Sequence, residues 1–255
     1  MKIAIIGAGA MGGAIVEGLL KAGHEGTDIC VSDPSAAVLD RFATKGTSVT
    51  TDNEKAAMGA DVVCVVVKPW LVESVLKDIA HILADKMLIV VAAGVPSAKI
   101  MEWIGQRPLF LCIPNIAIAQ LQSMTFLVPC GAVSQHQIQL VTALFNEMGQ
   151  TIVTDEQHLS AGTTLASCGI AYAMRYVRAA SEGGVELGFR ADEAKQIVMQ
   201  TMLGAVKLLE ASGMHPEQAI DLVATPGGLT IKGLNEMEHA GFTSSVIRGL
   251  KAAVK

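Results

Sequence analysis

The sequence predicts an α/β protein in two parts: a doubly wound, mainly parallel sheet in residues 1–154 and an all-helical domain in residues 155–255. Three observations support this. A short apolar run near the N-terminus breaks into a spaced glycine pattern, as a buried strand leading into a ligand-binding turn would. Strand-like and helical segments then alternate up to residue 154, which indicates parallel strands joined by helices. From residue 155 onward, apolar residues recur at helical spacing and strand-like runs disappear.

The N-terminal stretch KIAIIGAGAMGG predicts a dinucleotide-binding turn. Residues 3–6 are apolar on both faces, and Gly7-x-Gly9-x-x-Gly12 follows directly. In such a turn the first glycine allows a tight bend, the second lets a pyrophosphate approach the backbone, and the third lets the next helix pack on the strand. Residues 10–20 continue as a helix whose N-terminal amides and positive dipole end would face that pyrophosphate.

A second apolar run, residues 29–31, leads to Asp33, about 20 residues beyond Gly12, where such folds place the group that meets the adenosine ribose. Strand, glycine turn, helix, strand and acid thus come in the expected order. One alternative is a glycine-rich turn of another α/β protein. Another is a signal peptide, because Lys2 precedes an apolar run and residues 8–10 look like a cleavage site. Four glycines by position 13 argue against the signal peptide.

The later segments of the first domain place polar turns at the ends of buried strands. Ligands of open α/β sheets bind beyond the carboxyl ends of the strands, and there the sequence has Lys68-Pro69 and Pro114-Asn115. We predict strands at residues 61–67, 87–93, 109–113, 124–128 and 151–154, and helices at residues 35–45, 70–83, 97–104 and 134–148.

In the second domain, the segment Thr225-Pro226-Gly227-Gly228-Leu229-Thr230 is the most informative. Two glycines leading into a helix leave amides free to bind a substrate carboxylate, and Thr230 adds a hydroxyl in the first turn. An ordinary capped turn is the alternative. The predicted helices of this domain cover residues 156–182, 191–211, 215–223, 229–240 and 243–254, the first of them rich in small residues.

Composition excludes several classes of protein. Hydrophobic residues make up 51% of the chain and charged residues only 17%, so we expect an oligomer that hides apolar surface. The net charge of -5, without basic clusters, argues against nucleic acid as a partner. The uncharged stretch 108–136 is interrupted by prolines, amides and a glycine, which argues against a membrane span.

The five cysteines form no CxxC pair, which favours buried, reduced thiols in a cytoplasmic protein over a disulfide framework or a zinc site. The histidines are scattered without the spacing of metal ligands, so no metal is expected.

Taken together, the motifs resemble those of the pyrroline-5-carboxylate reductase family over almost the full length. The resemblance implies nicotinamide-dependent reduction of a cyclic imine to proline, and dimers formed through the helical domain that assemble further into rings, up to a decamer. The motifs that carry it, in order, are GAGAMGGAIVEGLL at 7–20, VKPW at 67–70, AAGV at 92–95, IPN at 113–115, GIAY at 169–172 and TPGGLTIKGL at 225–234.

The resemblance also implies roles for individual residues. The glycine turn would hold the pyrophosphate. Asp33, Asn53 and the turn at 66–69 would surround the adenosine end, and residues 91–93 with Asn115 would line the nicotinamide side. In the substrate loop, backbone amides would receive the carboxylate, and the Thr230 hydroxyl would lie near the imine nitrogen as the catalytic group. The cofactor residues are Ile6, Gly7, Ala8, Gly9, Ala10, Met11, Gly12, Asp33, Asn53, Val66, Val67, Lys68, Pro69, Val91, Ala92, Ala93 and Asn115, and the substrate residues are Thr225, Gly227, Gly228, Leu229 and Cys168.

The chain departs from the family pattern at several positions. Ile116-Ala117 replaces Thr-Pro, Cys168 and Ile170 replace a serine and a proline, Trp70 replaces a polar residue, and Leu229 stands where threonine is frequent. These changes imply a more apolar pocket. A reductase of a related cyclic imine and a non-catalytic dinucleotide-binding paralogue therefore stay open as alternatives.

The β-hydroxyacid dehydrogenases share the opening motif and a helical second domain, but they use a lysine on the long helix as a base. No lysine occurs here between Lys99 and Lys195, which argues against that group.

Cofactor choice rests on the residues around Asp33. Its carboxylate would accept hydrogen bonds from a ribose 2′-hydroxyl and repel a 2′-phosphate, which favours NADH. Ser32, Ser35 and Arg41 could still meet the phosphate of NADPH, so both cofactors are considered.

Overall fold

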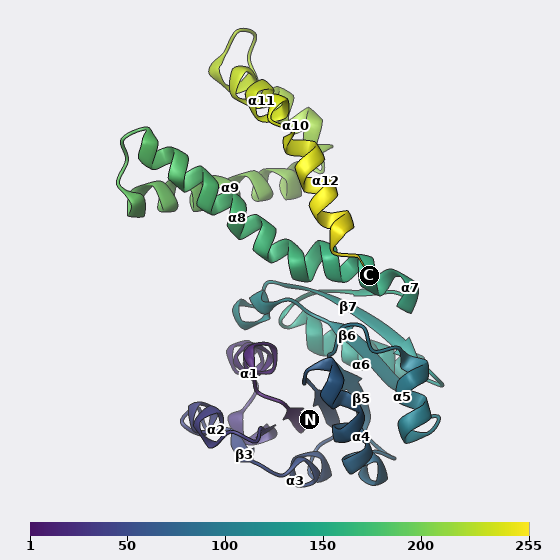
Figure 1. Cartoon of the computed structure of the whole chain (residues 1–255). Coiled ribbons are helices and arrows are strands. Elements are labelled where there is room, and N and C mark those ends of the chain that lie inside the picture. The colour runs from purple at the N-terminus through teal and green to yellow at the C-terminus, as the bar shows by residue number, and fades with distance from the viewer. Residues whose placement is uncertain (255) are drawn as a thin grey trace. The chain divides into compact units, whose positions relative to one another are not determined.

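An eight-stranded sheet in the order β3-β2-β1-β4-β5-β6-β7-β8 organises the first part of the chain. The computed structural model describes residues 1–254 (Figure 1). All neighbouring strands are parallel except β6 and β7, which pair antiparallel. The predicted doubly wound, mainly parallel sheet is thus confirmed. The strands are β1 Ile3–Ile6, β2 Ile29–Ser32, β3 Ser48–Thr50, β4 Val62–Val65, β5 Met87–Val90, β6 Leu109–Ile113, β7 Ser123–Cys130 and β8 Gly149–Val153.

Helices cover both faces of this sheet, because successive residues of its central strands point to opposite sides. Ile3 and Ile5 of β1 belong to one buried cluster, together with residues of α1, α2 and α6. Ala4 and Ile6 belong to a second cluster, with residues of α3, α4 and α5. The helices are α1 Ala10–Ala22, α2 Ala36–Ala43, α3 Asn53–Met58, α4 Val72–Ile79, α5 Ser97–Ile104, α6 Gln135–Asn146 and α7 Glu156–Gly162, and the short 3-10 turns are η1 Gly26–Asp28, η2 Pro69–Leu71, η3 Ala80–Ile82 and η4 Ile116–Gln120.

One strand and one α-helix were not predicted, the short strand β3 and the helix α3 that follows it; the 3-10 turns η1 and η4 were not predicted either. Strand β3 is largely exposed, so it lacks the apolar pattern by which a buried strand is recognised. Helix α3 has six residues and starts at a capped turn, where the Asp52 side chain accepts a hydrogen bond from the Lys55 amide. The helix predicted at 70–83 is also divided, into η2, α4 and η3.

The single helix predicted at residues 156–182 is wrong. The structure has helix α7, a π-helical turn η5 at Thr163–Cys168, and helix α8 at Gly169–Glu186. The chain divides into two compact units, Met1–Ile170 and a second unit from Ala171 onward, so α7 and η5 pack within the first unit. Strand β8 ends at Val153, and the described residues beyond it form helices and no further strand.

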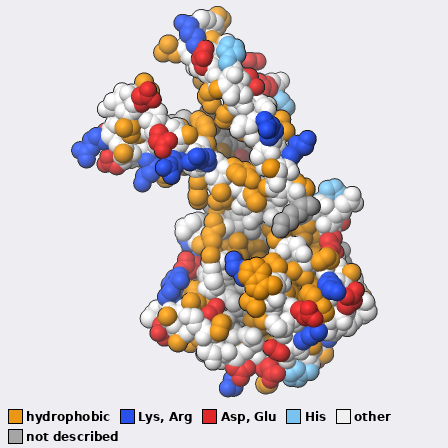
Figure 2. All heavy atoms as spheres, viewed as in Figure 1, with side chains coloured by type: hydrophobic (Ala, Val, Ile, Leu, Met, Phe, Trp, Pro, Cys, Tyr) orange, Lys and Arg blue, Asp and Glu red, His pale blue; other side chains and the backbone are white. Residues whose placement is uncertain are grey.

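The second unit is built from the greater part of α8 and four further helices, α9 Ala191–Ser212, α10 Pro216–Val223, α11 Leu229–His239 and α12 Phe242–Ala252. Among the residues of this unit that the structure describes, only Ala194 is fully buried. Large apolar side chains are exposed along its helices, as the orange spheres on the helical part show in Figure 2. Leu187, Leu208 and Leu222 are 83%, 67% and 72% exposed.

Within residues 1–254, no helix is both long enough and apolar enough to cross a bilayer.

Candidate functional site

The carboxyl ends of strands β1, β4 and β5 form one continuous edge. Beyond the strands the hydrogen-bond ladder continues, because the Gly7 amide donates to Ser32 O at 2.7 Å, the Val66 amide to Ile6 O at 2.8 Å, and the Val91 amide to Val65 O at 2.8 Å. Strands β2 and β3 lie on one side of β1, and β4 to β8 lie on the other. The order of the strands therefore reverses between β1 and β4, where ligands of such sheets bind.

The glycine turn at this edge has two crowded positions and one open position. Gly7 has φ +93°, and a Cβ there would lie 2.4 Å from Val66 O. A Cβ on Gly12 would lie 1.9 Å from Gly7 O, which shows how closely helix α1 packs on the turn. A Cβ on Gly9 would meet no atom within 4 Å. Gly7 thus lies in a tight turn, Gly12 lies where helix α1 packs on that turn, and Gly9 faces free space.

Helix α1 begins at Gly9 without a capping side chain. The first amides of a helix have no partner within it, and the positive end of the helix dipole adds to their attraction for an anion. Gly9 and Ala10 are exposed. An exposed, uncapped helix start beside an open glycine fits the pyrophosphate of a dinucleotide.

Asp33 contacts the glycine turn directly. Its Oδ2 accepts the Ala8 amide at 2.9 Å, and its Oδ1 accepts the Ser35 amide at 2.9 Å. The carboxylate is thus fixed at the end of β2 by two backbone amides, with its remaining lone pairs free for a ligand hydroxyl. Arg41, on the following helix, lies over the Phe42 ring, 5.5 Å from its centre.

Asn53 also reaches this edge, from the unpredicted helix α3. Its Oδ1 accepts the Ser32 hydroxyl at 2.7 Å, which ties the start of α3 to the end of β2. The structure thus brings Asp33 and Asn53 to the same strand end, as the prediction for the adenosine side requires.

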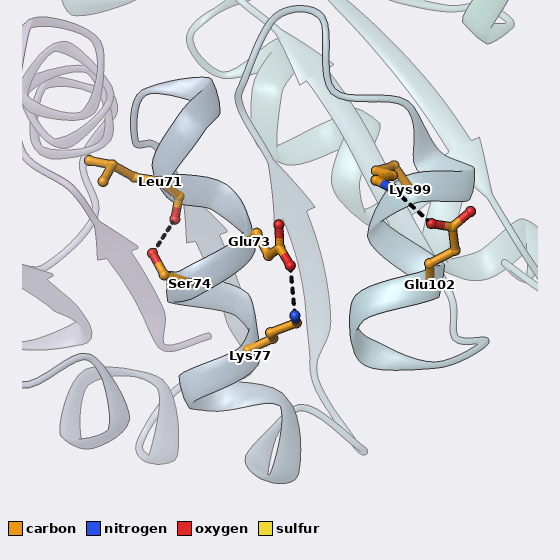
Figure 3. Close-up of polar contacts among 6 residues, drawn as sticks. All are labelled: Leu71, Glu73, Ser74, Lys77, Lys99 and Glu102. Carbon is orange, nitrogen blue, oxygen red and sulfur yellow. Dashed lines mark hydrogen bonds and ion pairs between the residues drawn. The ribbon is translucent and has the colours of Figure 1, made fainter.

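The turn after β4 carries Val66, Val67, Lys68 and Pro69 and leads through η2 into α4. Trp70, next in the chain, is 76% exposed. The Ser74 hydroxyl donates to Leu71 O at 3.0 Å and closes the junction between η2 and α4 (Figure 3). Figure 3 also shows two surface ion pairs, Glu73 with Lys77 at 2.6 Å and Lys99 with Glu102 at 3.0 Å. Exposed pairs of this kind contribute little to stability.

Of the residues predicted to line the nicotinamide side, Val91 and Ala92 are 8% and 7% exposed, and Ala93 is exposed. Asn115 is only 3% exposed. Its Oδ1 accepts the Ala117 amide at 3.0 Å, and its backbone amide donates to the Ser123 hydroxyl at 3.1 Å. Ser123 could not be identified as a partner of Asn115 from the sequence, because the hydrogen bond joins the end of β6 to the start of β7.

Within the helical unit, the predicted substrate segment forms the start of α11. Gly227 has φ +70°, Gly228 is the N-cap, and no side chain caps the helix. A Cβ on Gly228 would lie 2.5 Å from the Thr225 hydroxyl oxygen, so a side chain there would require the Thr225 side chain to rotate. Leu229 is 87% exposed, and Thr230 is exposed in the first helical turn. The Gly228 amide donates to Thr225 O at 2.9 Å, so the amides of Leu229 and Thr230 are the ones left free, beside the Thr230 hydroxyl. Such free amides at a helix start can bind a carboxylate.

Comparison with known proteins identifies the family of the chain. The model for pyrroline-5-carboxylate reductase dimerisation matches residues 156–255, and a model described as NADP oxidoreductase, coenzyme F420-dependent, matches residues 2–94. The pyrroline-5-carboxylate reductase of Pisum sativum is 33% identical over 99% of this chain and 93% of its own length. The chain belongs to the pyrroline-5-carboxylate reductase family.

Two further reductases support this membership. Pyrroline-5-carboxylate reductase 1 of Dictyostelium discoideum is 34% identical over 97% of this chain, which spans only 48% of the length of that relative. The crystal structure of the Plasmodium falciparum pyrroline carboxylate reductase with NADP bound has a TM-score of 0.91 and 25% identity, covering 100% of this chain and 95% of that one. The predicted reductase family and fold are confirmed, and the chain is an NAD(P)H-dependent oxidoreductase of this family. The dimerisation match supports oligomerisation of the helical unit.

One position where the chain departs from the reductase pattern, Cys168, closes the π-helical turn η5. All five cysteines are free thiols. Among the described residues, no group of three or more His, Cys, Asp or Glu side chains could hold a metal ion.

Burial makes the core thiols chemically inert. It raises the pKa of Cys64 to about 12, and burial together with the nearby Cys64 raises the pKa of Cys112 well above its usual range. Since the thiolate is the reactive form, we expect iodoacetamide at about pH 8 to label half-buried Cys168 much faster than buried Cys64. Peptide mass mapping of the native protein checks this order. Equal labelling of Cys64 and Cys168 would contradict it, and the denatured chain, in which all cysteines react, is the control.

Proposed function

We propose that this protein reduces the C=N bond of 1-pyrroline-5-carboxylate to L-proline, the last step of proline biosynthesis, using NADH or NADPH. The observation that carries the proposal is family membership over nearly the whole chain. The open, uncapped glycine turn supports it, because the chain offers the anion site that a dinucleotide requires.

On the cofactor side, the residues of the glycine turn would hold the pyrophosphate with their amides. Asp33, Asn53 and the turn from Val66 to Pro69 would surround the adenosine end, since all three lie at the carboxyl ends of β1, β2 and β4. Val91 to Ala93, at the end of β5, would line the nicotinamide side. When bound, the cofactor supplies the hydride.

On the substrate side, the amides of Leu229 and Thr230 would bind the carboxylate. The Gly228 amide, which donates to Thr225 O, would shape the loop around it together with Thr225 and Gly227. This anchor would hold the ring within range of the reduced nicotinamide, which is where most of the rate enhancement arises in such a reaction. Cyclic imines protonate near neutral pH, so the site needs no strong acid. The Thr230 hydroxyl would orient the imine nitrogen or pass a proton to it.

The departures at Ile116, Cys168 and Leu229 favour a second candidate, a reductase of a related cyclic imine. Ile116 is 43% exposed and Leu229 is 87% exposed, so both offer apolar surface to a ligand. A larger or less polar ring than pyrroline would gain from this surface.

The decisive experiment follows the absorbance of the reduced cofactor with five-membered and six-membered cyclic imino acids. Oxidation with pyrroline-5-carboxylate supports the first candidate, and faster oxidation with the six-membered imine supports the second. Cofactor binding without oxidation of the cofactor by either imine would contradict both, and would mean a non-catalytic dinucleotide-binding protein.

We further propose that the enzyme works in the cytoplasm as a homodimer formed through the helical unit, which can assemble into rings up to a decamer. The exposed apolar residues of α9 and α10 support an interface there. The five free thiols are compatible with a reducing compartment.

Asp33 should set the preference for NADH, because its charge opposes a 2′-phosphate. Asp33→Asn keeps an oxygen for the Ala8 amide but removes the charge, so we expect the ratio of kcat/KM for NADPH to that for NADH to rise roughly tenfold. Asp28→Asn, at the opposite end of β2, is the matched control and should leave the ratio unchanged. An unchanged ratio in Asp33→Asn would show that Asp33 does not determine the preference between NADH and NADPH.

A further inference from the structure

The π-helical turn η5 is bonded to the end of strand β6 at two points. The Asn115 side-chain amide donates from Nδ2 to Ala166 O at 3.4 Å, and the Ser167 hydroxyl donates to Pro114 O at 3.4 Å. These contacts join segments about fifty residues apart in the sequence. Pro114-Asn115 follows the strand nearest the predicted nicotinamide side, and Ala166-Ser167 directly precedes Cys168.

The hydrogen bonds of the Asn115 side chain determine which of its two amide atoms, Oδ1 or Nδ2, faces the π-helical turn. Its Oδ1 accepts the Ala117 amide at 3.0 Å, which requires the oxygen on that side and leaves Nδ2 as the atom that meets Ala166 O. The backbone amide of Asn115 is held by Ser123, whose hydroxyl is paired with Thr125 at 3.0 Å. Asn115 is 3% exposed, so water cannot easily replace these partners.

The π-helical turn itself is an energetically costly arrangement. π-helical turns are rare and recur at functional sites. Here the Thr164 hydroxyl, 2% exposed, has no hydrogen-bond partner among the described residues. A buried hydroxyl without a partner is destabilising, and such costs are often retained where local geometry serves a site.

We propose that Asn115 is a positioning residue, which holds the π-helical turn and its Cys168 in fixed register with the end of β6. The proposal rests on the proposed reductase function. It differs from the direct nicotinamide contact predicted from the sequence, because the Asn115 side chain faces the turn. Cys168 would then be held in place for the imine by the contacts of the turn with the end of β6.

Asn115→Asp tests this tether, because it keeps the acceptor for the Ala117 amide and replaces the donor with an oxygen that repels Ala166 O. We expect amide hydrogen exchange across residues 163–168 to become faster. In the same variant, kcat/KM for the imine should fall roughly tenfold through KM and kcat together, while the Kd of the cofactor stays within about twofold. Asn146→Asp, exposed at the end of α6, is the matched control and should change none of these.

Ser167→Ala removes the second bond alone and provides the same test if Asn115→Asp does not fold. It should speed exchange in residues 163–168 and lower kcat/KM for the imine, both to a smaller extent. Unchanged exchange in the variants that fold would overturn the tether. A parallel loss of cofactor affinity would overturn it in favour of direct nicotinamide contact. Failure of the wild-type enzyme to reduce any imine would instead refute the proposed function, and the exchange measurement would still test the tether.

Discussion

Replacing Gly12 with alanine is expected to abolish cofactor binding and to destabilise the fold. The added methyl group would lie 1.9 Å from the Gly7 carbonyl oxygen, and a backbone atom cannot rotate away as a side chain can. Helix α1 or the glycine turn must therefore shift. Overpacking of this kind costs about 1–3 kcal/mol or more, and the shift displaces the amides that bind the pyrophosphate. Thermal unfolding and a fluorescence titration with NADH measure the two effects.

Gly9→Ala and Gly59→Ala separate these effects. A methyl group on Gly9 meets no atom within 4 Å, so the unfolding temperature should hold while cofactor affinity falls, because the methyl occupies the space left for the phosphates. A methyl group on Gly59, at the end of α3, also meets no atom within 4 Å and should affect neither quantity. Wild-type binding and stability in Gly12→Ala would show that helix α1 does not pack on the turn as described.

Thr230→Ala is expected to lower kcat by roughly 100-fold if the hydroxyl transfers a proton, and by less if it only orients the imine. The cofactor Kd should not change, because the residues proposed to hold the cofactor, the glycine turn and Asp33, are left intact. Single-turnover oxidation of NADH in the presence of saturating imine measures the chemical step directly.

Two further variants test whether a loss of kcat in Thr230→Ala is due to the missing hydroxyl. Thr230→Ser keeps a hydroxyl in the first turn of α11 and should recover most of the rate. Thr243→Ala removes a hydroxyl of the same unit, bonded to Glu238 at 2.8 Å, and should leave kcat unchanged. Equal turnover in Thr230→Ala and the wild type would remove Thr230 from the mechanism.

The parts of the fold that the sequence predicted well are those in which burial and backbone geometry restrict residue choice. The strands β1 and β6 are apolar at every position and buried at every position. Gly7 and Gly12 tolerate no side chain, so their spacing marks the turn before any coordinates are known. Asp33 could be located from the sequence for the same reason, because it directly follows the next buried strand, β2.

The parts that the sequence did not predict depend on contacts between distant segments. Strand β3 is recognisable only by its pairing with β2, since its own residues are mostly exposed. The π-helical segment Thr163–Cys168, which interrupts the long helix, contains no proline that would predict a break. It is the segment that forms hydrogen bonds with Pro114 and Asn115. The roles of individual site residues stay predictions, to be decided by the variants proposed above.

The helical unit carries its apolar side chains outside and buries little more than Ala194. The family's dimerisation model covers these residues, so we expect much of the folding free energy of this unit to come from the proposed association with another copy. Stability then becomes a function of how much protein is present, as it is for obligate dimers. During synthesis, a newly made chain would complete its sheet alone but would need to meet a second chain before its last five helices become lasting structure.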